Sequence, residues 1–346
     1  MPHRAVRRPF LNLFAPEGDM TLILTHSDID ALIDRTSVYR AVEQAHADLT
    51  SGAASNPAPP QLPIADGGTA LPMVASSEPL GASVVKMLSD MPANVGRGLP
   101  SQRSTILLMS AQTGECEAVL DGRLITAIRT AAASAVATAH LATQRSSILG
   151  LIGAGTLAVE HARAICRIRN IEKVLVWSRS ASTVDSFRRR TADLDIQIEY
   201  AEFPRSILAS ADIVCTLTPS REPIVEGAWF RPGLHLNAVG APPRADHREI
   251  DGPGIGSSRL IVDSIPTALT KSGDVLLAIA EGHLQTQDVD VELGDVIVNP
   301  ALGRRSDDDI TLFNSVGIGL QDLVTARTLV DVAKQQGVGA SVRLNA

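Results

Sequence analysis

Residues 148–158 combine an apolar run with closely spaced glycines, in the order Ile-Leu-Gly-Leu-Ile-Gly-Ala-Gly-Thr-Leu-Ala. The spacing matches the Gly-x-Gly-x-x-Gly/Ala fingerprint that holds the pyrophosphate of a dinucleotide between a strand and a helix. In this interpretation Gly153 forms the tight turn, and Gly155 lets the backbone approach the phosphates. The helix expected next begins near Thr156 and Leu157 and directs free N–H groups at the anion. We therefore predict a dinucleotide site at this segment.

The end of the next expected strand, 173–177, indicates which dinucleotide binds. Enzymes that use NAD usually place an acidic residue there, where it accepts a hydrogen bond from the adenosine ribose. This chain has Ser178 and Arg179 instead. A hydroxyl and a guanidinium suit a 2′-phosphate, so we expect NADP, with NAD as the alternative cofactor. The competing interpretation makes Arg179 a solvated surface residue.

Arg129 and Thr130 lie in an alanine-rich helix, expected over 123–142, that leads towards the fingerprint. A guanidinium binds phosphate through paired hydrogen bonds. We expect Arg129, with Thr130 beside it, to form a second phosphate clamp. An arginine on the solvent face of the helix is the alternative.

Two residues are candidates for proton transfer. Lys86 lies in an otherwise apolar strand, where burial lowers the pKa of an ammonium group and prepares it to donate a proton. The alternative is an edge-strand lysine that prevents aggregation. Asp246 follows Val239 and Gly240, whose small size at a strand end would let a flat ring lie against the backbone. Asp246 is either a proton carrier at the mouth of the site or a surface residue.

From residue 148 onwards, strands alternate with helices, which predicts a parallel, doubly wound sheet of the Rossmann type. Ligands bind at the carboxyl ends of such strands, where Ser178, Thr218 and Gly240 fall. The expected strands span 148–152, 173–177, 212–217, 234–239 and 259–263. The expected helices span 156–168, 180–192 and 204–209, with a last helix over 315–336.

The composition excludes several classes of function. The chain has 346 residues and a net charge of −7, so neither nucleic acid nor an anionic membrane is expected as a partner. We find no apolar run that approaches the roughly 18 residues of a transmembrane helix. The three cysteines and eight histidines lack metal-ligand spacing, which predicts a cytoplasmic protein without a metal. Residues 1–19 contain several arginines but no secretory signal, and are expected to form a flexible extension.

Several segments together resemble the ornithine cyclodeaminase/mu-crystallin family. They cover nearly everything from about Met20 to the C-terminus, and their joint occurrence is specific. The most distinctive are Gly-Arg-Gly-Leu-Pro at 96–100, Leu-Asp-Gly at 120–122, Thr-Ala-Ile-Arg-Thr-Ala-Ala-Ala-Ser-Ala at 126–135, Gly-Ala-Gly at 153–155, Leu-Asn-Ala-Val-Gly-Ala at 236–241 and Thr-Leu-Phe-Asn-Ser-Val-Gly at 311–317.

The resemblance implies a homodimer in which a Rossmann domain, residues 129–314, is inserted into an α+β dimerisation and substrate domain. That second domain is built from both chain ends, residues 20–128 and 315–346. The family's chemistry takes place on α-amino or α-imino acids through a nicotinamide cofactor. Mapped onto this chain, its catalytic lysine is Lys86, twelve residues before Gly98, and its phosphate-contacting arginine is Arg129. Its nicotinamide-side serine is Ser315.

Ser101 and Gly317 complete the expected cofactor contacts.

Two departures from the family pattern bear on the reaction. Ornithine cyclodeaminases have Gly-Gly-Asp where this chain has Gly-Ala-Pro at 240–242, which argues against ornithine cyclisation. Near residues 59–63 many members have an arginine that holds the substrate carboxylate, whereas this chain has none; Arg103 is a candidate substitute.

We therefore predict an NADP(H)-dependent oxidoreductase that acts on the carbon–nitrogen bond of a small α-imino or α-amino acid. In the reductive direction the nicotinamide supplies a hydride and a protein acid protonates the nitrogen. Two other hypotheses remain open. One is an ornithine cyclodeaminase, which releases ammonia with no net redox change. The other is an NADP-dependent binding protein without turnover, of the mu-crystallin type.

Overall fold

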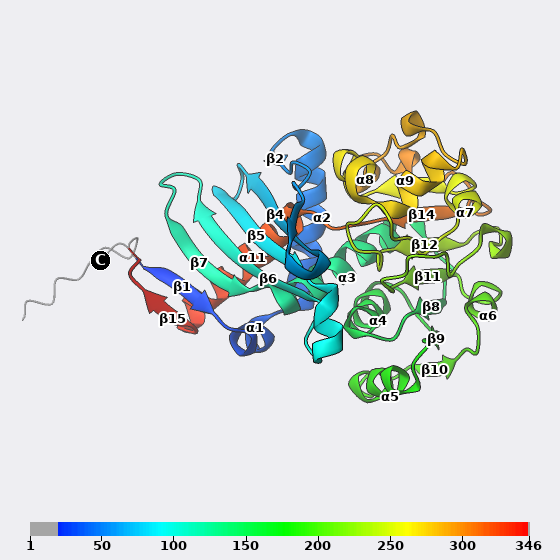
Figure 1. The fold of residues 1–346 in the computed structure, drawn as a ribbon, viewed down its shortest axis with the longest axis horizontal. Helices are drawn as coiled ribbons and strands as arrows, with labels where there is room; N and C mark the ends of the chain where they lie inside the picture. Colours follow the sequence, from blue (N-terminus) through cyan, green and yellow to red (C-terminus); the bar gives the residue numbers. More distant parts are fainter. Residues whose placement is uncertain (1–19, 345–346) are drawn as a thin grey trace, which may run out of the picture.

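The computed structural model describes residues 20–344, which form two sheets lying side by side with helices between them (Figure 1). The expected segment 1–19 lies outside the described residues. One sheet is mixed and mainly antiparallel, and the other is fully parallel. This arrangement confirms the predicted fold class, a Rossmann-type sheet combined with an α+β unit.

The mixed sheet uses strands from both ends of the chain. Its order is β15-β1-β7-β6-β5-β4-β2, with β3 paired to β4. Alternate residues along β4 and β5 are buried, so one face packs against helices and the other does not. The strands are β1 (Thr21–Leu24), β2 (Ala54–Ser55), β3 (Leu62–Ile64), β4 (Gly68–Ser77), β5 (Ala82–Asp90), β6 (Gln102–Ser110), β7 (Cys116–Asp121) and β15 (Ala340–Val342).

Four helices pack on this sheet or on one another beside it. They are α1 (His26–Leu32), α2 (Arg35–Ser51), α3 (Gly122–Leu141) and α11 (Gly319–Gln336). The C-terminal helix α11 returns from the parallel sheet to lie on β4, β5 and β6 (Figure 1). The N- and C-terminal parts of the chain therefore share one hydrophobic core.

The parallel sheet has the order β10-β9-β8-β11-β12-β14-β13. The sequence predicted five of its strands and missed β10 and β14. The strands are β8 (Ile148–Ile152), β9 (Lys173–Trp177), β10 (Gln197–Tyr200), β11 (Ile213–Thr216), β12 (His235–Ala238), β13 (Arg259–Val262) and β14 (Thr311–Asn314). The helices that accompany them are α4 (Thr156–Ile168), α5 (Ala181–Arg190), α6 (Pro204–Leu208), α7 (Gly252–Gly256), α8 (Ile265–Lys271), α9 (Gly273–Ala280) and α10 (Leu293–Val298).

Helix α3 is the central connection between the two sheets. It is continuous across residues 128 and 129, where we expected a domain boundary. By length and composition it could cross a membrane, contrary to the expectation that no segment would, but most of it is buried inside the protein. Its alanines allow close packing against α2 and α4. A thin, buried helix thus sets the distance between the two halves.

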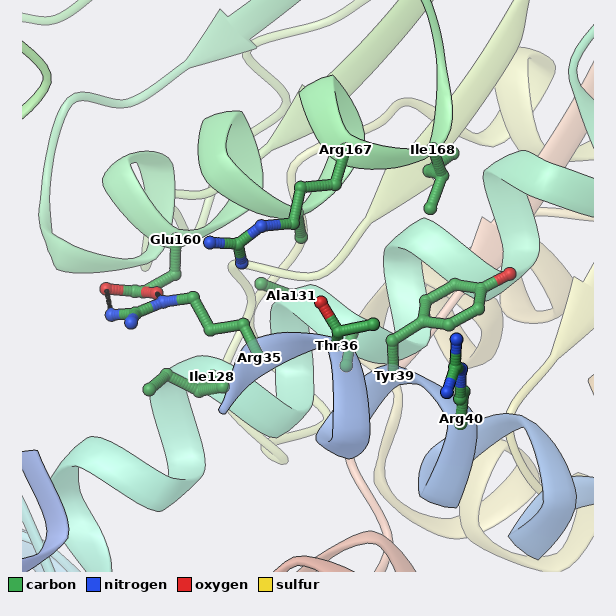
Figure 2. A pocket seen from close by; sticks show the side chains of 11 residues that line it. Arg35, Thr36, Tyr39, Arg40, Ile128, Ala131, Glu160, Arg167 and Ile168 are labelled. Carbon is green, nitrogen blue, oxygen red and sulfur yellow. Dashed lines mark hydrogen bonds and ion pairs between the residues drawn. The ribbon is translucent and has the colours of Figure 1, made fainter. Parts of the chain in front are cut away.

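Two ion pairs join the two halves. Arg35 of α2 forms two hydrogen bonds with Glu160 of α4, with N–O distances of 2.7 and 3.0 Å (Figure 2). Arg244, which follows β12, donates to Asp90 at the end of β5 over 2.6 Å. Glu160 and Asp90 are almost fully buried, so each needs its cation. The pairs fix the relative position of the two sheets and hence the space between them.

Candidate functional site

A cleft of about 910 Å³ lies between the two halves of the molecule. One wall comes from the parallel sheet and carries the fingerprint helix and the ends of β12 and β14. The other wall comes from the mixed sheet and α3, and includes Met73, Leu88, Arg103 and Arg129. The predicted residues that line the cleft are Arg129, Thr130, Thr156, Leu157, Val239, Gly240, Ser315 and Gly317.

The fingerprint has the geometry that a dinucleotide requires. Gly153 has a φ of +113°, and a Cβ atom there would lie 2.8 Å from the carbonyl oxygen of Leu217. A Cβ at Gly155, by contrast, would meet no protein atom within 4 Å. Helix α4 begins directly afterwards at Thr156, so its free N–H groups face this open space. The residues present therefore fit the pyrophosphate of a nicotinamide dinucleotide.

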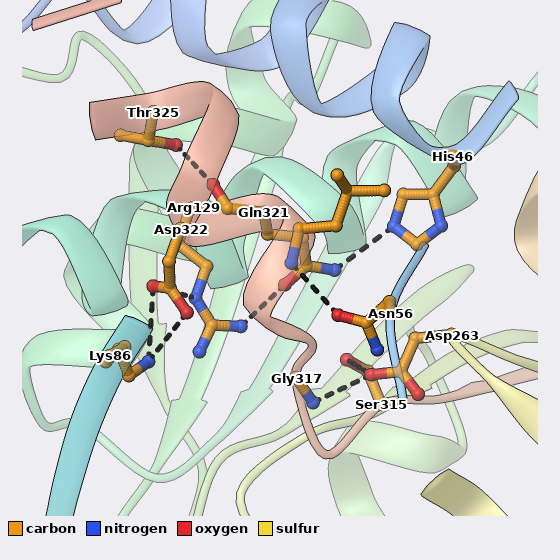
Figure 3. Close-up of polar contacts among 11 residues, drawn as sticks. His46, Asn56, Lys86, Arg129, Asp263, Ser315, Gly317, Gln321, Asp322 and Thr325 are labelled. Carbon is orange, nitrogen blue, oxygen red and sulfur yellow. Dashed lines mark hydrogen bonds and ion pairs between the residues drawn. The ribbon is translucent and has the colours of Figure 1, made fainter. Parts of the chain in front are cut away.

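On the opposite wall, two cations share one buried carboxylate. Lys86 Nζ lies 3.2 and 3.0 Å from the two carboxylate oxygens of Asp322, and Arg129 Nε donates to the same carboxylate over 3.2 Å (Figure 3). Arg129 also donates to Gln321 Oε1 over 2.5 Å. Gln321 in turn contacts His46 Nε2 at 3.1 Å. This chain of contacts fixes the guanidinium of Arg129, whose side chain lines the cleft.

The alternative interpretations of these two cations, an edge-strand lysine and an arginine on the solvent face, are both wrong. Strand β5 lies between β4 and β6, so Lys86 does not guard a sheet edge. Arg129 is only 3% exposed, so it is not on a solvent face. Burial, helped by the charge of Arg129, lowers the pKa of Lys86 to about 8, although Asp322 acts in the opposite direction. Lys86 is fully buried and is not part of the cleft lining.

The turn after β14 forms the floor beside Arg129. Ser315 Oγ and Gly317 N both donate to Asp263 Oδ2 over 2.7 Å (Figure 3). A Cβ at Gly317 would lie 2.5 Å from the guanidinium of Arg129, so this position requires glycine. Because Ser315 Oγ uses its proton on Asp263, its lone pairs remain available as acceptors towards the cleft.

Besides Lys86, Gly153 and Gly155, five predicted site residues lie outside the cleft lining. Asp246 is 62% exposed, and a hydrogen bond from the ring of His247 lowers the pKa of its carboxyl group. Ser101 is half-buried directly before β6. Ser178 and Arg179 follow β9, and Arg179 is exposed without an ion pair in the described part of the chain. Thr218 is held by Glu249 at the end of β11.

Sequence reasoning missed Asp322, Gln321 and Asp263. An acidic residue inside the otherwise apolar, buried first turns of α11 was an available signal for Asp322. No signal marked Asp263, which follows a short buried strand. Across residues 20–344, no group of three His, Cys, Asp or Glu side chains is placed to hold a metal ion.

The two fingerprint positions allow a selective test of cofactor binding. Because a Cβ at Gly155 enters open space, Gly155→Val should fold normally while blocking the approach of the pyrophosphate. We expect fluorescence titration to show no NAD(P)H binding, with an unchanged melting temperature. Gly96→Val is the matched control, since a Cβ there also meets no atom within 4 Å. Normal titration of Gly155→Val would show that the glycine pair only forms a turn.

Comparison with known proteins identifies the family of this chain. A model of the ornithine cyclodeaminase/mu-crystallin family matches residues 19–337. Alanine dehydrogenase from Archaeoglobus fulgidus is 31% identical over 93% of this chain and 98% of its own length. Ketimine reductase mu-crystallin from Rattus norvegicus is 34% identical over 75% of this chain and 79% of its own.

A solved structure of Delta(1)-pyrroline-2-carboxylate reductase from Thermococcus litoralis, in complex with NADH and L-proline, superposes with a TM-score of 0.90. It is 37% identical, and the match covers 93% of this chain and 100% of that one. The predicted activity class and cofactor class are thereby confirmed: the chain is an NAD(P)-dependent oxidoreductase of small imino or amino acids. With sequence and fold both matching, the chain belongs to the ornithine cyclodeaminase/mu-crystallin family.

Proposed function

We propose that this chain uses NADPH to reduce the carbon–nitrogen double bond of a small α-imino acid. The observation that carries this proposal is the cleft itself, in which a dinucleotide fingerprint faces a buried group of two cations and one carboxylate. When bound, the nicotinamide supplies the hydride. The protein residues bind the anionic groups, exclude water and provide the proton.

The cations on the mixed-sheet wall have distinct proposed roles. Arg129 lines the cleft with a fixed guanidinium and binds an anionic group, a phosphate or a carboxylate. Lys86 is the proposed source of the proton, because its pKa is lowered to about 8 and because Asp322, which it shares with Arg129, places its enclosed ammonium next to the cleft wall. Asp246 is the weaker candidate, since its carboxyl group is exposed and deprotonated at neutral pH.

The substrate carboxylate needs an anchor, because residues 59–63 contain no arginine. Arg103 lines the cleft and has no ion-pair partner within the described ranges. We assign the anchoring role to Arg103. Net NADPH consumption with an imine substrate supports the reductase, whereas ammonia release with catalytic cofactor would indicate a cyclodeaminase. Tight NADPH binding without turnover would indicate a binding protein.

We also propose a homodimer formed through the outer face of the mixed sheet. One row of apolar side chains crosses five neighbouring strands on the face opposite α11. Each member pairs directly with the next in the sheet register, and all are only partly buried or exposed. The row is Ile23, Val119, Leu107, Val85 and Val74. A second copy would remove this patch from water.

Replacement of Lys86 tests the proton donor. Lys86→Met keeps the apolar stem and removes a costly buried ammonium, so the fold and NADPH binding should be retained. We expect imine reduction to slow at least ~100-fold, the lower range for loss of a general acid. Single-turnover NADPH oxidation at saturating imine measures this. An unchanged rate would remove Lys86 from the mechanism.

The pH profile gives an independent check on the same residue. Only protonated Lys86 can donate, so the wild-type rate should fall as pH rises through about 8. Asp322→Asn removes the charge that raises the pKa of Lys86, and should move this limb to lower pH. If the rate of Asp322→Asn falls at the same pH as that of the wild type, the titrating group is not Lys86.

Arg179 tests the preference for NADP. Arg179→Ala should weaken NADPH binding by about 1.5–3 kcal/mol, because a charge-assisted hydrogen bond to the 2′-phosphate is lost. NADH binding should be nearly unchanged. Arg189→Ala, which removes another exposed arginine from the same region, is the control and should affect neither cofactor. Equal losses for both cofactors, or a wild-type preference for NADH, would contradict the assignment.

The dimer face can be tested by light scattering. Leu107→Glu places a charge in the centre of the apolar row on both copies, and we expect a monomer at micromolar concentration. Leu80→Glu is the control: Leu80 is 38% exposed, like Leu107 at 37%, but lies in the turn between β4 and β5. A dimer that persists in Leu107→Glu would place the interface elsewhere.

A further inference from the structure

A buried acid, Glu249, lies directly behind the cleft and is not explained by the proposed chemistry. It is fully buried and receives four hydrogen bonds at its carboxylate. Thr216 Oγ1 donates over 2.7 Å, and Thr218 donates twice, from N over 2.6 Å and from Oγ1 over 2.8 Å. Gly240 N donates over 2.8 Å. The four donor groups belong to three residues at two neighbouring strand ends.

The backbone of Glu249 is fixed as firmly as its side chain. Asp274 Oδ1, at the start of α9, accepts from the N–H groups of Glu249 and Ile250 over 2.9 and 3.1 Å. Asp274 Oδ2 accepts from Asn314 Nδ2 over 3.3 Å. Glu249 therefore has little freedom to leave the strand ends, because both its main chain and its carboxylate are held.

The strand ends that Glu249 joins are those of β11 and β12, which are adjacent and parallel. Thr218 and Gly240 follow these strands, and a Cβ at Gly240 would overlap the backbone of Thr218 and Leu217. Gly240 also lines the cleft. The carboxylate thus occupies the inner side of two loops whose outer side is the crevice where ligands of such sheets bind.

We propose that Glu249 is a positioning residue, which holds the ends of β11 and β12 in the conformation that binds the dinucleotide. It touches neither the cofactor nor the substrate, and it acts through the backbone of Thr218 and Gly240. This inference rests on the proposed use of the cleft by NADPH.

The hydrogen-bond partners of Glu249 favour the ionised form of its carboxylate. Every polar contact at its carboxylate is a donor, so the ionised form satisfies all four, and a proton would displace at least one. Burial, followed by the charge of Asp274, raises the pKa of Glu249 to about 7. The other titratable group facing it is Cys215 on β11, whose own pKa is raised by burial, so it stays a neutral thiol. Protonation of Glu249 therefore loosens the loops as pH falls through about 7.

Glu249→Gln tests the proposal with little change in shape. The substitution replaces one carboxylate oxygen of Glu249 with an NH₂ group, which cannot accept the hydrogen bonds that this oxygen receives. At pH 8 we therefore expect NADPH to bind at least about tenfold more weakly, as measured by fluorescence titration. Thr191→Val is the control for a general loss of stability, because Thr191 is fully buried in the same half and its hydroxyl bonds only to the carbonyl oxygen of Phe187 in α5. Its NADPH affinity should stay within about twofold of wild type.

The pH series separates positioning from stability. Between pH 8 and pH 6, the NADPH affinity of the wild type should fall more steeply than that of Glu249→Gln. The 2′-phosphate of NADPH titrates in both experiments and therefore does not account for a difference between them. Asp274→Asn should shift this response to lower pH, because the charge of Asp274 contributes to the raised pKa of Glu249. Equal affinity and equal pH dependence in wild type and Glu249→Gln would overturn the inference. Absence of NADPH binding by the wild type would instead overturn the proposed function.

Discussion

The carboxylate of Asp322 is the contact on which the substrate side of the cleft depends. Lys86 and Arg129 come from a strand and a helix of the N-terminal part of the chain, and both bond to this one acid on the C-terminal helix. Without it, two buried cations would repel each other in a region of low dielectric. With it, and with the buried acid Asp263, which interacts with Arg129 from the adjoining turn, two acids face the two cations.

The dependence of the site on Asp322 gives a physical reason for the order of the elements along the chain. Asp322 reaches Lys86 only because α11 leaves the parallel sheet after β14 and returns to β4, β5 and β6. The turn that makes this return carries Ser315 and Gly317, and Gly317 packs against the guanidinium of Arg129. The connection between the two halves is therefore itself part of the site, and the site is incomplete until both chain ends are in place.

The sequence predicted the features that are local. The glycine fingerprint, the alternation of strands and helices and the alanine-rich helix each depend on neighbouring residues, and all three occur in the structure. The sequence did not reveal β14, because α8, α9 and α10 separate it from β13 in the chain and it falls outside the regular alternation of strands and helices. Asp322, Asp263 and Glu249 were missed for another reason. Their partners are distant in the sequence, and only the fold shows which buried acid faces which donor.

These three acids act in the same way on the two walls of the cleft: each fixes the groups that donate to it. Asp322 holds cations, Asp263 holds the Ser315 hydroxyl and a backbone N–H, and Glu249 holds hydroxyls and backbone N–H groups. Each is fully buried and acts behind the surface that a ligand would meet. A buried carboxylate with several donors can be satisfied in few arrangements, so it fixes its partners more strictly than apolar contacts do. The cleft walls are therefore fixed at the positions where we propose that anions and the cofactor bind. The segments at the rim, including residues 241–247 and 89–104, are not held by these acids, and we expect them to determine substrate choice.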